Sequence, residues 1–337
     1  MVSAQPAVPG NRVDFRQVTT HPDVDLSPRL SPDGKWLAYV SRQTYNFDIW
    51  IQSSGGGRAR QITLNKADDF YPVWFPDGKA LAFVSHSSDA AGDIYRIRFK
   101  EVDGQLIPRE EPHRITSYLG YDGYPTVSPD GKKIAFVSNR SGRDEVWFWN
   151  ETTGKTNQLT FLGGTQPAWS LNQELIAFTS FRADSGDNGD IYLMNLSGPK
   201  PVAPSALWDE RELPVYRITT GAAVDGFPAW SKNADRLAFL RFDEDTNHDG
   251  LVTPADRGCL WAADVFPFPQ TAAMLFSKPL LAESFNPLLV RAAMALTSGA
   301  EQVMQPWYGA DRRVYFTSDR GGNRSEEHTS ELQSPNT

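Results

Sequence analysis

The stretch YPTVSPDGKKIAFVS (124–138) decides the fold, because similar stretches recur along the chain. The copies are SPRLSPDGKWLAYVS (27–41), YPVWFPDGKALAFVS (71–85), QPAWSLNQELIAFTS (166–180), FPAWSKNADRLAFLR (227–241) and QPWYGADRRVYFTS (305–318). The first proline of each copy lies at Pro28, Pro72, Pro125, Pro167, Pro228 and Pro306, which gives spacings of 44, 53, 42, 61 and 78 residues. Such periods indicate repeated supersecondary units, and the longer spacings require insertions.

Each repeat divides into four short strands. Within YPTVSPDGKKIAFVS, two strands flank the tight turn SPDG (128–131), in which Pro129 sets φ and Gly131 accepts a positive φ. Third strands follow as FDIWIQ (47–52), GDIYRIRF (92–99), DEVWFWN (144–150), GDIYLMNL (189–196) and CLWAADV (259–265). Fourth strands end as RQIT (60–63), HRIT (113–116), NQLT (157–160), YRITT (216–220) and ALT (295–297).

Radial repetition of four-stranded sheets leaves only short, protected sheet edges. We therefore predict an all-β fold, a six-bladed β-propeller of four-stranded blades that start near residues 26, 70, 123, 165, 226 and 303. FRQVTT (15–20) carries the fourth-strand signature before the first blade, so we expect it to pair into the last blade and close the ring. The recurring aromatic position of the third strand predicts packing between blades rather than a carbohydrate platform.

The C-terminal segment is expected to lie outside the fold. RSEEHTSELQS (324–334) matches, residue for residue, the translation of a common sequencing-library adapter. We therefore treat residues 324–337 as a non-native tail, 15–323 as the propeller and 1–14 as an N-terminal extension. The last blade is then truncated after two strands, and the natural protein is expected to be longer, by at least a strand and up to a whole further domain.

The charge balance of the 337-residue chain limits its partners. With 33 Lys and Arg residues and 41 Asp and Glu residues, the chain has a net charge of −8, and its basic residues do not cluster in one segment. This charge distribution argues against nucleic acid or an anionic membrane surface as a partner. No run of about 18 apolar residues is present, so we expect no membrane span. We also expect a monomer. The single Cys259 forms no intramolecular disulfide, and MVSAQPAVPGN (1–11) lacks the features of a signal peptide, which is absent, removed or lost.

The SPDGKxLAFVS and DIW motifs resemble the propeller repeats of the TolB family, an envelope component of the Tol–Pal system. The resemblance covers roughly residues 15–323 and is shared with the N-terminal propellers of prolyl oligopeptidase-like and dipeptidyl-peptidase-like enzymes. It implies a periplasmic or extracellular protein without catalytic activity that binds a protein or peptide partner. Two departures are the short segment before the first blade, where TolB has a separate α/β domain, and an acidic loop in the fifth repeat.

That acidic loop, DTNHDGLVTPAD (245–256), fits the template of a calcium loop. The expected ligands are Asp245, Asn247, Asp249, the carbonyl of Leu251, Thr253 and Asp256, with Gly250 at the turn. Thr253 and Pro254 suit the start of one helical turn that delivers the last ligand. We predict a structural calcium with a dissociation constant on the order of 10⁻⁴ to 10⁻³ M, as in extracellular modules. The alternative is a solvated acidic turn that binds nothing.

Four arginines follow the second strands of their repeats, at positions whose loops gather on one propeller face: Arg42, Arg140, Arg182 and Arg320. They are candidates for binding an acidic peptide or a carboxylate. The favoured alternative is that they form ion pairs with the carboxylates that open the third strands, namely Asp48, Asp93, Glu145 and Asp190.

The sequence contains no G-x-S-x-G, H-E-x-x-H or Walker motif, which favours a binding protein over an enzyme. Two other functions stay open. One is the gating propeller of a truncated prolyl oligopeptidase-like serine hydrolase, and the other is a glycan-binding propeller. An insertion in the fifth repeat carries the apolar stretch LLVRAAMAL (288–296), for which we consider a short helix on the rim or a partner surface.

Overall fold

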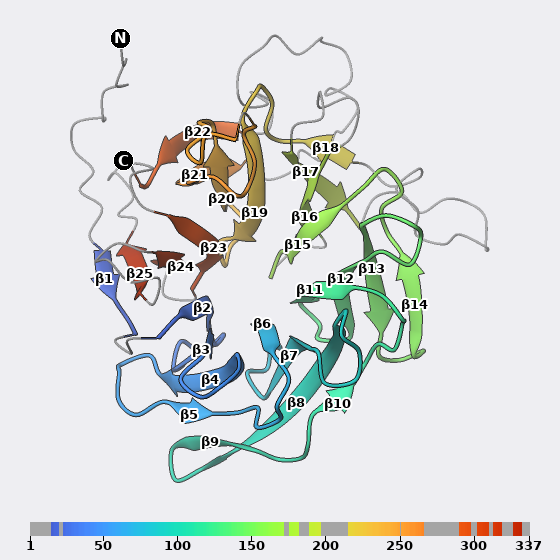
Figure 1. Cartoon of the computed structure of the whole chain (residues 1–337), viewed down its shortest axis with the longest axis vertical. Coiled ribbons are helices and arrows are strands. Elements are labelled where there is room, and N and C mark those ends of the chain that lie inside the picture. Colours follow the sequence, from blue (N-terminus) through green and yellow to red (C-terminus); the bar gives the residue numbers. More distant parts are fainter. Residues whose placement is uncertain are drawn as a thin grey trace.

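In the computed structural model, antiparallel sheets surround a central axis, with one strand of each sheet next to that axis (Figure 1). The structure describes residues 15–19, 23–171, 175–181, 189–196, 215–249, 251–265, 290–297, 302–309, 313–318 and 326–331. The elements in these ranges are all strands. Within them, no helix is long and apolar enough to cross a membrane.

Five blades are built from consecutive strands. Blade 1 contains β2 (Asp25–Leu30), β3 (Trp36–Ser41), β4 (Asp48–Ser53) and β5 (Arg60–Gln61). Blade 2 contains β6 (Asp69–Trp74), β7 (Ala80–Ser85), β8 (Asp93–Val102) and β10 (His113–Arg114), with β9 (Gln105–Pro108) paired to β8. Blade 3 contains β11 (Asp122–Val127), β12 (Lys133–Ser138), β13 (Glu145–Asn150) and β14 (Lys155–Gln158).

Blade 4 contains β15 (Thr165–Trp169), β16 (Leu175–Ser180), β17 (Asp190–Asn195) and β18 (Val215–Arg217). Blade 5 contains β19 (Val224–Trp230), β20 (Arg236–Phe242), β21 (Cys259–Val265) and β22 (Val290–Ala295). The segment considered as a short helix is thus the outer strand β22, because its backbone completes the ladder beside β21. The predicted boundaries of the second and third strands agree with these blades to within one to three residues.

A further sheet, here called the closing sheet, joins the two ends of the chain. It orders β23 (Val303–Tyr308), β24 (Arg313–Ser318), β25 (Glu326–Glu331) and β1 (Phe15–Gln17), which lie together at the left of Figure 1. The expectation that the N-terminal strand pairs into the last sheet is confirmed.

The prediction of six blades with a truncated last member needs correction. The structure has five blades of consecutive strands, and the sheet after them is a composite of both ends with four strands. Residues 326–331, which were expected to lie outside the fold, occupy its third-strand position and pair with β24 from Arg313↔Glu331 to Ser318↔Glu326. The physical reason is that the free edge of β24 is a hydrogen-bonding template that any extended segment can fill.

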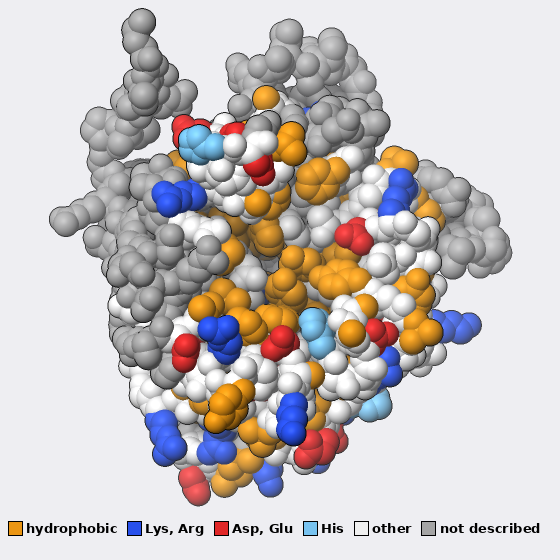
Figure 2. Space-filling view, viewed as in Figure 1, with side chains coloured by type: hydrophobic (Ala, Val, Ile, Leu, Met, Phe, Trp, Pro, Cys, Tyr) orange, Lys and Arg blue, Asp and Glu red, His pale blue; other side chains and the backbone are white. Residues whose placement is uncertain are grey.

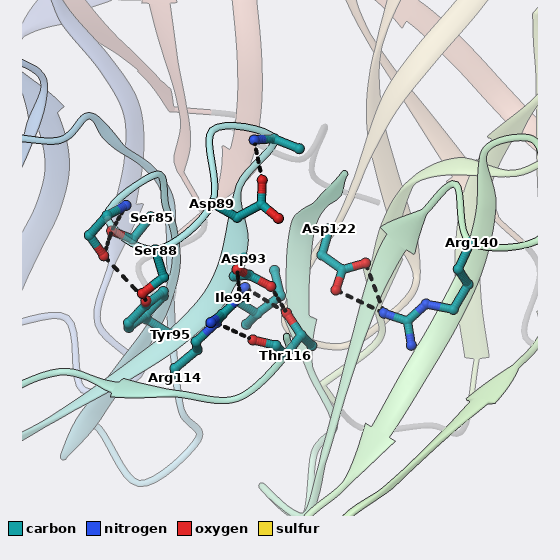
Figure 3. A network of polar contacts seen from close by, with 12 residues as sticks. Ser85, Ser88, Asp89, Asp93, Ile94, Tyr95, Arg114, Thr116, Asp122 and Arg140 are labelled. Carbon is teal, nitrogen blue, oxygen red and sulfur yellow. Dashed lines mark hydrogen bonds and ion pairs between the residues drawn. The ribbon is translucent and has the colours of Figure 1, made fainter. Parts of the chain in front are cut away.

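A buried carboxylate opens the third strand of the first four blades. These carboxylates belong to Asp48, Asp93, Glu145 and Asp190, which are at most 1% exposed. Each accepts a hydrogen bond from the hydroxyl of the threonine after the fourth strand, which is Thr63, Thr116, Thr160 or Thr219. The same hydroxyls accept the N–H of the following third-strand residue, as from Ile94 to Thr116 at 2.9 Å (Figure 3). This pairing is why the fourth strands share an I/L-T ending.

Blade 5 departs from this pattern in one partner only. Cys259 stands where the other blades have a carboxylate, while Thr297 still accepts the N–H of Leu260 at 2.9 Å. Between the blades, the recurring aromatic residues of the third strand pack into the apolar clusters, as predicted. They are Trp50, Tyr95, Trp147, Tyr192 and Trp261.

The inner strands share a backbone feature that keeps the axis narrow. In each of them the residue before the proline has a positive φ of 49–56°, namely Ser27, Tyr71, Tyr124, Gln166, Phe227 and Gln305. The pairing register shifts at the same place, as between Gly123 and Thr126 of β11. A bulge of this kind bends the strand and redirects its side chains.

The threonine pairing gives the first testable prediction. Thr160→Val keeps the side-chain shape but removes the 2.8 Å acceptor of the Val146 N–H and the 2.6 Å donor to Glu145 Oε2, which retains the N–H of Gly163 at 3.0 Å. We expect the free energy of unfolding in urea to fall by about 1–3 kcal/mol. The exposed Thr152→Val is the matched control and should change it by less than about 0.5 kcal/mol. Equal values for the two variants would contradict the role assigned to this pairing.

Candidate binding face

The loops between second and third strands and the loops between blades lie at one end of the propeller. Backbone hydrogen bonds join the two kinds of loop: the N–H of Asp69, Asp122 and Asp225 donates to the carbonyls of Phe47, Gly92 and Gly189 at 2.7, 3.1 and 2.7 Å. We call this end the binding face. Its described loop residues are 18–19, 23–24, 42–47, 62–68, 86–92, 115–121, 139–144, 159–164, 181, 189, 218–223, 243–249, 251–258, 296–297 and 302.

Exposed apolar side chains concentrate on the binding face. Among the described residues, the exposed large hydrophobic side chains in its loops are Tyr45, Leu64, Tyr118, Leu119, Leu162, Phe181 and Leu251. Only Val102 and Leu171 lie elsewhere. Tyr45 is 101% exposed and Leu119 90% exposed, so these side chains contribute nothing to the core. Apolar side chains that gather on one surface mark an interaction site.

The axis beneath this face is closed by aromatic side chains. The rings of Tyr71 and Tyr124 lie 4.4 Å apart, and Tyr124 contacts Phe227 at 6.3 Å although the two come from blades 3 and 5. The space left at this level is about 50 Å³. Burial raises the pKa of Tyr121 and Tyr124, so both hydroxyls stay protonated. Figure 2 shows hydrophobic side chains gathered around the centre of the viewed face.

The predicted arginine ring is not assembled in the described part of the chain. Arg140 lies on the binding face, but its guanidinium bonds both oxygens of the buried Asp122, at 2.9 and 2.8 Å, and its side chain is 18% exposed (Figure 3). Arg42 is exposed and lies over the ring of Phe47. Arg182 and Arg320 lie outside the described residues.

Arg140 therefore forms an ion pair, as the alternative predicted, but its partner is not one of the predicted carboxylates. The carboxylate is the one that opens the first strand, Asp122, while Glu145 at the start of the third strand is paired with Arg143 at 2.6 Å.

Among the ion pairs that sequence reasoning missed, three hold other buried carboxylates of this face. Arg114 pairs with Asp93 at 2.6 Å, Arg217 with Asp190 at 2.6 Å, and Arg241 with Asp225 at 2.8 Å. The first two arginines stand two residues before the fourth-strand threonine, in HRIT and YRIT. That shared position was the signal that could have found them. Arg241 replaces the serine that usually ends the second strand.

Asp69 at the start of β6 is a buried acid without such a cation. Its side chain is inaccessible, and it accepts a hydrogen bond from the Asn65 amide at 3.0 Å. Blade 2 has Ser87 at the position that Arg140 occupies in blade 3. Within the described residues, no cation forms an ion pair with Asp69. Burial raises the pKa of Asp69 to about 6.

The acidic loop of blade 5 is organised by Asp256. Its carboxylate accepts the N–H groups of Thr253, Thr246 and Asn247 at 2.8, 2.8 and 3.1 Å, and these bonds hold its pKa below the usual value. The N–H of Asp256 returns to the carbonyl of Thr253 at 3.0 Å, which forms the expected turn.

The other predicted ligands shape the first half of the same loop. Asp245 accepts the N–H of His248 and Asp249 at 2.7 and 3.2 Å, and Asn247 also accepts that of Asp249. Leu251 is 64% exposed, and Gly250 lies outside the described residues. Among the described residues, no group of three or more His, Cys, Asp or Glu side chains is placed to hold a metal.

No family model matches the chain. Among curated proteins, TolB homologues of Chlorobium chlorochromatii and Chlorobium luteolum are 29% and 31% identical over 129 and 140 residues. These matches cover 38% and 42% of this chain and 25% and 30% of the relatives, so the chain spans less than a third of their length. A Tricorn protease homologue of Saccharolobus solfataricus is 26% identical over 113 residues, 32% of this chain and 10% of the relative.

Solved structures show the same fold. TolB from Acinetobacter baumannii superposes with a TM-score of 0.52 at 22% identity, over 73% of this chain and 53% of that protein. An oligogalacturonate lyase from Vibrio parahaemolyticus gives a TM-score of 0.52 at 13% identity, over 95% and 97% of the two chains. At these identities the structural likeness shows the fold alone. The sequence matches confirm that the repeats are TolB-like.

Asp69 gives the second prediction, on pH dependence. Because its folded pKa lies above the ordinary 3.8, its contribution to stability is full below pH 4 and is lost as the pH rises through about 6. Asp69→Asn should therefore raise the free energy of unfolding at pH 7.5 by up to about 3 kcal/mol relative to wild type. The difference should shrink toward zero at pH 4, as measured by urea unfolding.

The exposed Asp103→Asn is the control, and it should shift stability equally at both pH values. A pH-independent difference for Asp69→Asn would contradict the assignment.

Proposed function

We propose that this TolB-like β-propeller is a non-catalytic envelope protein that binds a protein or peptide partner through the binding face. The observation that carries the proposal is the concentration of exposed apolar side chains in the loops of that face. The TolB homologues support a periplasmic or extracellular location.

The form of the face favours a macromolecular partner over a small ligand. Its apolar side chains project from separate loops, and the axis beneath them narrows to about 50 Å³, well below the roughly 300 Å³ of the smaller ligand pockets. Protruding apolar anchors separated by polar loops suit a partner that covers several loops at once. Arg42 adds an exposed cation to this surface.

A second candidate is the gating propeller of a longer hydrolase. The match to a Tricorn protease homologue favours it, because it shows that similar repeats occur in a protease. The genomic sequence after the codon for residue 323 discriminates the two functions. A G-x-S-x-G motif there, followed by the remaining members of a catalytic triad, would replace the binding function with the enzymatic one. A glycan-binding propeller has only the fold-level likeness to the lyase in its favour.

A structural calcium in the loop of 245–256 belongs to the same proposal. The first half of the loop brings the side-chain oxygens of the half-buried Asp245 and the exposed Asn247 and Asp249 into one tight turn. Asp256 holds the two halves together through backbone N–H groups, so the loop is shaped before any ion enters it. A cation there would clamp a long hairpin at the edge of the binding face.

The partner prediction uses panning of a displayed peptide library on the purified protein. Leu119→Ser combined with Leu162→Ser removes two exposed anchors from neighbouring loops. We expect the affinity of enriched peptides to fall by about tenfold or more, as for loss of one or two binding hot spots. Val102→Ser, which removes an exposed apolar side chain outside the face, should leave it unchanged. Equal effects of the two changes would overturn the assignment of the face.

The calcium prediction uses thermal unfolding with about 5 mM calcium and then with a chelator. With a dissociation constant on the order of 10⁻⁴ to 10⁻³ M, calcium should add about 1–2 kcal/mol to the free energy of unfolding. Asp245→Asn is the matched variant, because an amide oxygen still accepts the two N–H groups while the charge is lost. It should abolish the calcium effect. An unchanged midpoint of the wild type in calcium would remove the metal from the proposal.

A further inference from the structure

The opposite end of the axis holds a second cavity, which we call the turn-face pocket. It has a volume of about 340 Å³ and lies among the ends of the inner strands and the turns that follow them. Each blade and the closing sheet contributes to its wall, through Leu30, Val73, Val127, Trp169, Lys232 and Tyr308 among others. This volume falls within the range of about 300–1,000 Å³ that is typical of small-molecule sites.

The turn-face pocket is blind rather than part of an open channel. The aromatic side chains of Tyr71, Tyr124 and Phe227 narrow the axis between it and the binding face. Two glutamines hold the same level together, because Gln166 accepts the N–H of Phe227 and Gln305 accepts that of Ser27, each at 2.8 Å. A ligand therefore enters from the turn face only, and its size is limited by the blind end.

The wall is mainly apolar, and it contains two buried hydrogen-bond donors that have no partner within the described part of the chain. They are the indole N–H of Trp169 and the hydroxyl of Tyr308, in side chains that are 4% and 5% exposed. Burial raises the pKa of Tyr308, so its hydroxyl stays a donor. Buried donors of this kind are rare in folded proteins and call for an explanation.

Tryptophans at the same repeat position in two other blades can be compared with Trp169. At the same position of other blades, the indole N–H of Trp74 donates to the carbonyl of Arg29 at 2.9 Å, and that of Trp230 to the carbonyl of Ala168 at 3.2 Å. In blade 4 the backbone N–H of Trp169 donates to the hydroxyl of Thr126 at 3.1 Å. The indole N–H of Trp169 makes no corresponding bond within the described residues and lies next to the cavity.

The mouth of the turn-face pocket carries a positive charge. Lys232 is exposed and, within the described residues, has no ion-pair partner. It belongs to the blade 5 turn SKNA (231–234), where blades 1 and 3 have SPDG and blade 2 has FPDG, and Ala234 takes the positive φ of the glycine in those turns. None of the described residues that line the pocket is acidic. The carboxylates of neighbouring turns accept N–H groups of their own turns, as Asp33 does from Lys35 and Asp130 from Lys132.

We propose that the turn-face pocket binds a small amphipathic carboxylate. Its apolar body lies between Leu30, Val73 and Val127, and its carboxylate meets Lys232 at the mouth. An oxygen of the ligand accepts from Trp169 or Tyr308, which a small rotation of either side chain allows. The site is independent of the proposed partner binding, because it lies at the other end of the closed axis.

The test is calorimetric titration of the whole chain with 4-phenylbutyrate and with the uncharged 4-phenylbutanol as the matched probe. We expect saturable binding of one carboxylate per chain, with about fivefold weaker binding of the alcohol. Lys232→Met should remove that preference, whereas Lys79→Met, an exposed lysine of the blade 2 turn that does not line the pocket, should keep it. Both lysines are exposed, so both variants are expected to fold.

A third variant tests whether the ligand binds inside the pocket or on the protein surface. Trp169→Phe keeps the ring and removes the free donor, so it should weaken both probes by a similar factor while leaving the unfolding midpoint unchanged or higher. Absence of saturable binding of either probe at millimolar concentration would overturn the proposal. So would a carboxylate preference that survives Lys232→Met. The paired change Leu119→Ser and Leu162→Ser on the binding face should have no effect, which separates this site from partner binding.

Discussion

The buried hydrogen bond between the first carboxylate of the third strand and the threonine after the fourth strand is the contact on which the blade design depends. It fixes where the outer strand ends, and through the N–H of the next third-strand residue it fixes the register of both strands. The loop to the following blade starts directly after that threonine. Because the contact recurs in blades 1 to 4, the loops of the binding face leave their blades at equivalent places.

This contact requires acids in places where charge is unfavourable. Burial raises the pKa of Asp48 and Asp93, and it raises the pKa of Asp190 to about 6 even though Arg217 lies beside that acid. Arg114 and Arg217 offset part of this penalty in blades 2 and 4, and they are thereby withdrawn from ligand binding. Arg140 is withdrawn in the same way by its pair with Asp122, the acid that opens the first strand of blade 3. The paired arginines at this end of the protein therefore act in folding, while exposed apolar side chains project from its loops.

A second constraint is the closure of the axis. The residues with positive φ before the prolines direct aromatic and amide side chains toward the centre, where Tyr124 and Phe227 meet across it. The consequence is a scaffold with two separate surfaces. One is broad and formed by loops, and the other is a blind apolar pocket whose mouth carries Lys232. Their separation allows each to be changed without the other.

The repeat pattern alone predicted the strands, their order within a blade and the pairing of the N-terminal strand with the last sheet, because alternation and turn residues act locally. The sequence also located the acidic loop and its turn at Thr253. It could not show that Arg140 reaches Asp122, that Asp256 binds three backbone N–H groups, or that residues 326–331 fill a sheet edge. Those outcomes depend on which groups become neighbours when strands far apart in the chain are packed. The exposed face and the blind pocket were likewise decided by tertiary structure, since burial and enclosure are properties of the assembled ring and not of any one repeat.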